Sequence, residues 1–144
     1  MKIALSSCLA GNKVRYDGTD KYNETIMKLL KNHDVVYICP EQISGFPIPH
    51  DPLEIKDNKV FTDKGIDVTG ILYKGSLKTY EMIKDCDLLI LKSKSPSCGY
   101  KKIYDGHFNG TIIDGNGIFT QLCIDNNMDI YTENDIEILT KILG

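Results

Sequence analysis

Three of the five cysteines share one feature, because each follows a short apolar segment typical of a β-strand: Cys8 after residues 2–7, Cys39 after 34–38 and Cys98 after 87–91. Cysteine thiolates bind iron–sulfur clusters and zinc, and a reactive cysteine can also act as a nucleophile. If the three strands are parallel neighbours, their carboxyl ends lie at one edge of the sheet. The pattern therefore predicts cysteine chemistry at that edge.

The cysteine pattern leaves three chemistries open. Three cysteines can hold a [4Fe–4S] cluster in which one iron keeps an open position for water or substrate. They can instead bind zinc with an open position, or one of them can act alone as a nucleophile. The sequence contains no Cys-x-x-Cys pair and no evident histidine–acid pairing, so spacing alone does not choose among the three.

The other two cysteines have different positions. Cys86 lies between a predicted helix and a predicted strand, at the opposite edge of the sheet, and Cys123 lies within a predicted helix. Free cysteine is often buried as a small apolar residue, so we expect both in the core. An odd, scattered set of five favours free thiols in a reducing cytoplasm.

Polar residues beside the three cysteines could take part in acid–base chemistry. Glu41 closely follows Cys39 and could act as a general base, or it could stabilise the start of a helix. Ser95 and Ser97 stand in the turn with Cys98, where they could bind a substrate or a cluster sulfide, or cap the turn.

Further residues could bind the substrate. Arg15, Tyr16 and Asp17 follow Cys8 in a loop and could bind an anion or the edge of a heterocycle, or anchor the loop through an ion pair. Lys94 could hold an anionic group or face water. The three histidines, which include His50, are not paired by spacing, and none is predicted to be a ligand.

The elements that position these residues alternate along the chain. Apolar segments predict strands at 2–7, 34–38, 87–91 and 128–131. Helical spacing predicts helices at 22–32, 67–84, 117–127 and 136–143, although Gly75 weakens the second of them. A hairpin is expected near residues 60–61, a second hairpin or a long ordered loop at 100–117, and an extended proline-rich loop at 43–54. The alternation predicts an α/β fold, a Rossmann-like three-layer single domain over residues 1–144 with a mainly parallel sheet.

Length and charge exclude several classes of protein. A chain of 144 residues fits one domain. The net charge of −3 argues against a large basic surface for nucleic acid. No apolar run approaches the length of a membrane-spanning helix, and the apolar residues before Ser6 are too few for a secretory signal.

Four motifs, in this order, resemble a bacterial and archaeal family that includes thiouracil desulfidases: SSCLAGNKVRYDG, CPEQISGFPIPHDPLE, KSKSPSCG and IYDGHFNGTIIDGNGIFT. The resemblance extends from Lys2 to about Tyr131. Family members often carry Arg where His50 and Lys94 stand here. The first difference could alter the rim of the pocket, and the second keeps the charge but loses a bidentate fork.

The resemblance implies a site and an activity. Cys8, Cys39 and Cys98 would hold a [4Fe–4S] cluster whose remaining iron binds the sulfur of the substrate. Glu41 would act in acid–base steps, assisted by a serine, Ser95 in preference to Ser97. The reaction would be a non-redox desulfuration of a thiolated nucleobase such as 2-thiouracil. Water would attack the carbon, and the products would be the oxo base and hydrosulfide.

Alternatives to this reading remain. The chain could be a non-catalytic module that binds zinc or an iron–sulfur cluster, or a desulfidase that acts on thiolated nucleosides or tRNA. We expect a small-molecule base as partner, with no membrane and no nucleic acid. The oligomeric state stays open between a monomer and a homodimer.

Overall fold

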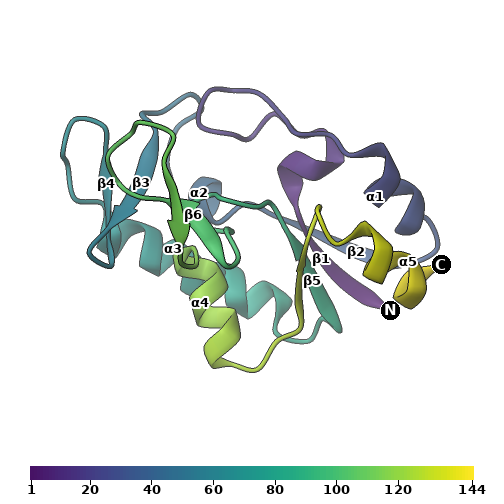
Figure 1. Cartoon of the computed structure of the whole chain (residues 1–144). Helices are drawn as coiled ribbons and strands as arrows, with labels where there is room; N and C mark the ends of the chain where they lie inside the picture. The colour runs from purple at the N-terminus through teal and green to yellow at the C-terminus, as the bar shows by residue number, and fades with distance from the viewer.

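The computed structural model describes all 144 residues and has a parallel sheet at its centre (Figure 1). Four strands pair in the order β2-β1-β5-β8, and every pairing is parallel. Their bounds are Lys2–Ser6 for β1, Asp34–Ile38 for β2, Leu88–Leu91 for β5 and Ile130–Thr132 for β8. The predicted mainly parallel sheet is confirmed.

Helices cover both faces of this sheet and produce three layers. The helices α1 (Glu24–Leu29) and α5 (Ile136–Leu143) cover one face, and α3 (Thr69–Ile83) and α4 (Ile118–Asp125) cover the other. The central strands β1 and β5 are buried on both faces, which explains their nearly continuous apolar sequence. The three-layer α/β fold is therefore confirmed.

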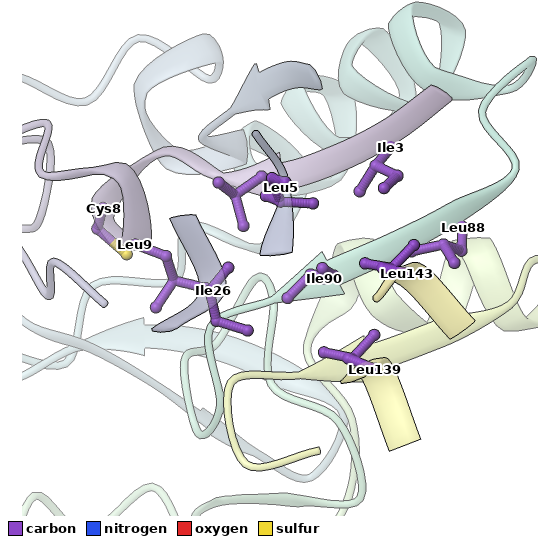
Figure 2. Close-up of a cluster of buried hydrophobic side chains, with 10 residues drawn as sticks. Ile3, Leu5, Cys8, Leu9, Ile26, Leu88, Ile90, Leu139 and Leu143 are labelled. Carbon is purple, nitrogen blue, oxygen red and sulfur yellow. The ribbon is translucent and has the colours of Figure 1, made fainter. Parts of the chain in front are cut away.

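The two faces use alternate residues of the same strands, because successive side chains of a strand point to opposite sides. Figure 2 shows one face, where Ile3 and Leu5 of β1 meet Leu139 and Leu143 of α5. Ala4, which lies between the two β1 residues, belongs to the cluster under α3 and α4. The core thus fixes the direction and register of the strands whose ends carry the cysteines.

Two short hairpins lie at the end of the molecule opposite the two termini (Figure 1). One joins β3 (Leu53–Lys56) to β4 (Lys59–Thr62), and the other joins β6 (Lys102–Tyr104) to β7 (Ile112–Asp114). Asp57 and Asn58 connect β3 to β4 with φ angles of 52° and 63°, as a two-residue hairpin turn requires. Both hairpins were expected, but β3 begins inside the segment predicted as a loop.

A short helix, α2 (Pro40–Ile43), precedes the segment predicted as a loop and includes its first residue. Pro40 stands at its first position, where a missing N–H costs nothing. Helix α3 runs unbroken through Gly75. The glycine is needed there because the end of α2 and α3 are in close contact. A Cβ at Gly75 would lie 1.8 Å from Ser44 Oγ and 2.7 Å from Ser44 Cα, so only glycine permits this approach.

The remaining elements differ from the prediction mainly at their ends. Strand β1 stops at Ser6, and Ser7–Ala10 form a 3₁₀ turn, η1. Helix α1 is shorter than predicted. Asn23 caps it, since its side chain accepts a hydrogen bond from the N–H of Ile26 at 3.0 Å. None of the helices combines the length and the apolar character needed to cross a membrane.

Candidate active site

Cys8, Cys39 and Cys98 all line one cavity of about 660 Å³, located where three neighbouring parallel strands end. Cys8 lies in η1 directly after β1, and Figure 2 shows it beside Leu9, beyond the end of the strand. Cys39 directly follows β2 and precedes α2. Cys98 lies in the turn after β5. The topology therefore brings together three cysteines that are far apart in the sequence.

The turn that carries Cys98 is held from two sides. Inside the turn, the hydroxyl of Ser95 accepts a hydrogen bond from the N–H of Cys98 at 2.7 Å. From outside, the N–H of Ile118, at the start of α4, donates to the carbonyl of Pro96 at 2.8 Å. The turn thus accepts a hydrogen bond from one of the first N–H groups of α4, which have no acceptor within the helix.

Glycine allows α4 to approach this turn so closely. Gly117 precedes α4 and donates its N–H to the carbonyl of Gly99 at 2.7 Å. A Cβ at Gly117 would lie 2.4 Å from the carbonyl carbon and oxygen of Ser97. The position of Cys98 thus depends on contacts between the turn and α4.

The protein alone does not favour thiolates at this site. Burial raises the pKa of the Cys8 thiol to about 11, although the nearby Lys92 ammonium lowers it. Burial likewise raises the pKa of Cys39 and that of Cys98. The proximity of Cys39 and Cys8 also raises the pKa of Cys98. Three thiolates together would need added positive charge, which a bound metal centre supplies.

The arrangement of donors agrees better with a cluster than with a single ion. No three side chains of His, Cys, Asp or Glu converge closely enough to hold one metal ion. In a [4Fe–4S] cluster each thiolate binds a different iron, so the sulfurs surround the cluster and do not meet at one point. Three cysteines around one cavity fit this donor set and would leave one iron without a protein thiolate.

Glu41 lies in the first turn of α2 and lines the same cavity. Its Oε2 accepts a hydrogen bond of 2.9 Å from the hydroxyl of Ser97, and that hydroxyl lies 3.8 Å from Cys98 Sγ. Ser95 Oγ is 3.3 Å from Ser97 Oγ. Of the two predicted serines, Ser97 therefore contacts the carboxylate, and Ser95 mainly holds the turn.

The predicted substrate residues divide into two groups. Arg15, Tyr16 and Lys94 line the cavity. Asp17 does not, because its side chain is exposed and accepts hydrogen bonds from the N–H and the hydroxyl of Thr19. The structure thus brings three of the four residues to the cysteines and places the carboxylate of Asp17 in a surface turn.

Sequence reasoning missed the wall of the cavity that the hairpins form. Glu54 of β3 and Tyr104 of β6 line it, together with Phe108 from the loop between β6 and β7. Glu54 accepts hydrogen bonds from the N–H groups of Gly106 at 3.0 Å and of Phe108 at 3.1 Å. No local pattern reveals these residues, because their position depends on the packing of one hairpin against the other.

His50 was also missed as a functional candidate. Its Nε2 lies 3.4 Å from Glu41 Oε1, and His50 itself does not line the cavity that Glu41 lines. The chain between Glu41 and His50 contains α2 and an irregular segment, so no periodicity relates the two side chains. One signal was present, since the resembling family often has a basic residue at this position.

Comparisons with known proteins identify the family of this chain. The sequence matches the family described as 2-thiouracil desulfurase over residues 3–135. The uncharacterized protein YbbK of Bacillus subtilis (strain 168) is 36% identical over 146 residues, covering 93% of this chain and 97% of that protein. The [4Fe–4S]-dependent thiouracil desulfidase TudS has a solved structure with a TM-score of 0.89 and 32% identity, covering 99% of this chain and 97% of TudS. The chain belongs to the 2-thiouracil desulfurase family.

Proposed function

We propose that this protein is an iron–sulfur-dependent enzyme that hydrolyses the C–S bond of a thiolated nucleobase such as 2-thiouracil. The observation that supports this proposal most strongly is the cavity that joins three cysteines to Glu41. The cavity volume of about 660 Å³ lies within the usual range for small-molecule sites, about 300–1,000 Å³.

Cys8, Cys39 and Cys98 would hold a [4Fe–4S] cluster. When bound, such a cluster supplies an iron with an open position, a Lewis acid with affinity for the sulfur of the substrate. The similarity to a [4Fe–4S]-dependent enzyme over nearly the whole chain supports this assignment.

Glu41 would act as the general base. Its carboxylate lines the cavity and is held at Oε2 by the hydroxyl of Ser97. In this position it can take a proton from the water that attacks the thiocarbonyl carbon, and it can return that proton as sulfur leaves. Acid–base groups of this kind typically contribute about 10²- to 10⁴-fold to the rate.

Arg15, Tyr16 and Lys94 would orient the base. Arg15 and Lys94 carry only hydrogen-bond donors, which suit the carbonyl oxygen of a pyrimidine. Tyr16 offers a hydroxyl that can donate or accept, and its ring can contact the face of the heterocycle. All three line the cavity together with the cysteines.

The proposed reaction requires no electrons. Water supplies the oxygen that replaces sulfur, so the thiocarbonyl of the base becomes a carbonyl. Sulfur leaves as hydrosulfide with one proton of the water, and the second proton is released to solvent. The carbon keeps its oxidation state, so neither an oxidant nor a reductant enters the balance.

The test is turnover of 2-thiouracil by anaerobically reconstituted protein in water labelled with ¹⁸O. We expect uracil and sulfide in equal amounts, one labelled oxygen in uracil, and no need for an electron donor. The same chain without its cluster is the control and should be inactive. Absence of uracil, or turnover only with added reductant, would contradict the proposal.

A further inference from the structure

The imidazole of His50 is buried next to Glu41 and has no part in the reaction as described so far. Its side chain is only 7% exposed. The ring lies near two aromatic rings, with centroid distances of 5.1 Å to Phe46 and 6.2 Å to Tyr16. The backbone N–H of His50 donates to the carbonyl of Tyr16 at 2.7 Å, so the residue is fixed in place from several sides.

One ring nitrogen of His50 has a defined role. Nδ1 lies 2.6 Å from the backbone carbonyl oxygen of Asp51. A carbonyl oxygen only accepts hydrogen bonds, so Nδ1 must carry a proton and donate it. Nε2 then has a lone pair when the ring is neutral and a second proton when the ring is charged.

The other ring nitrogen points toward the proposed general base. Nε2 lies 3.4 Å from Glu41 Oε1, and it is buried without a hydrogen-bond partner. A lone pair would repel a carboxylate at this distance, whereas an N–H would be attracted. The contact is longer than a good hydrogen bond, and catalytic contacts of this kind often tighten when the substrate binds.

We propose that His50 is a positioning residue for Glu41, whose Oε1 faces the Nε2–H of His50 while the hydroxyl of Ser97 holds Oε2. This inference rests on the proposed role of Glu41 in desulfuration. Each carboxylate oxygen can accept more than one hydrogen bond, so a Glu41 that is held at both oxygens can still receive a proton from water. The two contacts fix the plane of the carboxylate toward the cavity.

The charges around His50 favour the protonated ring. Glu41 faces it from α2 and Asp51 from its own segment, while Lys64 pairs with Asp51 at 3.0 Å. Tyr16 faces it from the loop after η1, where Arg15 lies close to the Tyr16 ring. Burial lowers the pKa of His50, but the contacts with Glu41 and Asp51 outweigh it and raise the pKa above its usual value near 6.5.

Two substitutions separate the N–H from the ring. His50→Phe keeps an aromatic ring near Phe46 and Tyr16 but removes both nitrogens. His50→Gln removes the ring but can present a side-chain N–H near the position of Nε2. We expect kcat for 2-thiouracil to fall roughly 10- to 100-fold in H50F, because a slightly misplaced catalytic group costs a rate factor of this size. In H50Q, kcat should stay within several-fold of wild type. The iron content of both variants should equal that of wild type.

The pH profile distinguishes positioning from packing. As pH rises and Nε2 loses its proton, kcat of the wild type should fall, and this limb should be missing in H50Q, whose N–H does not titrate. If H50F is as active as the wild type, or if H50F is active and H50Q is not, His50 acts through packing and the proposal is wrong.

A measurement that needs no turnover keeps the proposal testable on its own. Nitrogen-15 NMR of the histidine rings in the full chain should show the Nδ1–H form of neutral His50, assigned by its absence in H50F. Glu41→Gln should lower the pH at which this ring loses its second proton. A neutral ring with its proton on Nε2, or no response to Glu41→Gln, would overturn the inference even if the wild type did not desulfurate 2-thiouracil. Inactive wild type would refute only the proposed function.

Discussion

Cys98 at the carboxyl edge of the sheet and Cys123 in α4 are both buried but differ in their neighbours. Cys98 is 4% exposed and Cys123 is 0% exposed, and burial raises the pKa of both thiols. For Cys123, whose pKa rises to about 12, burial is the only cause. Two other thiols, Cys39 and Cys8, also raise the pKa of Cys98, and hydrogen bonds with the hydroxyls of Ser6 and Ser97 lower it. Neighbouring polar groups, rather than burial, therefore distinguish the site from the core.

Cys86, at the opposite edge of the sheet, has charged neighbours but does not belong to the site. Cys86 lies there, between α3 and β5, next to charged residues. Asp85 pairs with Lys2 at 2.6 Å, but both side chains are exposed. Exposed ion pairs contribute little, and Cys86 does not line the cavity. Charged residues near a cysteine are thus not sufficient to make a binding site; an enclosed space for a ligand is also needed.

The strongest test of this comparison replaces one cysteine from each region. Cys98→Ser should lose the visible absorbance of the cluster and reduce desulfuration to background, because an alkoxide is a poor substitute for a thiolate. Cys123→Ser should keep both properties and instead destabilise the protein by about 1–3 kcal/mol, since it buries a hydroxyl. Absorbance spectra, turnover and urea unfolding measure these effects. The reverse pattern would contradict the comparison.

Within the site, Glu41→Gln should separate chemistry from cofactor binding. The amide keeps the shape of the side chain but cannot act as a base, so we expect kcat to fall about 10²- to 10⁴-fold. The visible spectrum and the iron content should match those of the wild type. A Glu41→Gln protein with normal turnover would show that another group serves as the base.

The two serines of the turn should respond differently. Ser97→Ala removes the donor to Glu41 Oε2 and should lower kcat by about 10-fold, which corresponds to roughly 1.4 kcal/mol. Ser95→Ala removes the acceptor of the Cys98 N–H and should mainly weaken iron retention. Parallel measurements of kcat and of iron loss to a chelator test this division of roles. Equal kcat losses with unchanged iron would contradict it.

The contact between α4 and the turn can be tested with a pair of glycine substitutions. Gly117→Ala forces a Cβ to 2.4 Å from the Ser97 carbonyl and should cost about 1–3 kcal/mol of unfolding free energy. Gly70→Ala in α3 meets no atom within 4 Å and should be neutral or stabilise the helix by up to about 1 kcal/mol. Only the first should also loosen the cluster.

The smallest expected effect is a change of stability with pH. The folded pKa of His50 is raised, so the stabilisation from its charged form is complete below the unfolded value of about 6.5. It is lost as pH rises through the higher folded value. The difference in unfolding free energy between wild type and H50F should therefore be larger at pH 6 than at pH 9. A difference that grows with pH would refute this sign.

The sequence was most informative where structure is local. Buried strands such as Leu88–Leu91 form continuous apolar runs, and the expected parallel order correctly places the ends of β2, β1 and β5 at one edge. On the condition that these strands are parallel neighbours, which the structure meets, the pattern predicted that Cys8, Cys39 and Cys98 lie at one edge. The roles of all the site residues, the three cysteines included, stay predictions.

The sequence was least informative where contacts join distant segments. Helix α2 is one turn long and begins with proline, which resembles a loop when only the sequence is read. Its close contact with α3 depends on Gly75, and the contact of Glu41 with His50 depends on how the irregular chain after α2 returns. Such contacts follow from the packed structure and not from a repeat in the sequence.

The most direct test of the central claim is the iron and acid-labile sulfide content of the chain after anaerobic reconstitution. We predict about four irons and about four sulfides per chain, with a broad visible absorbance that is lost in air. The three cysteines at the carboxyl edge would then hold an open-site cluster. One zinc or a single iron per chain without sulfide, or no metal at all, would contradict the claim and leave only the fold standing.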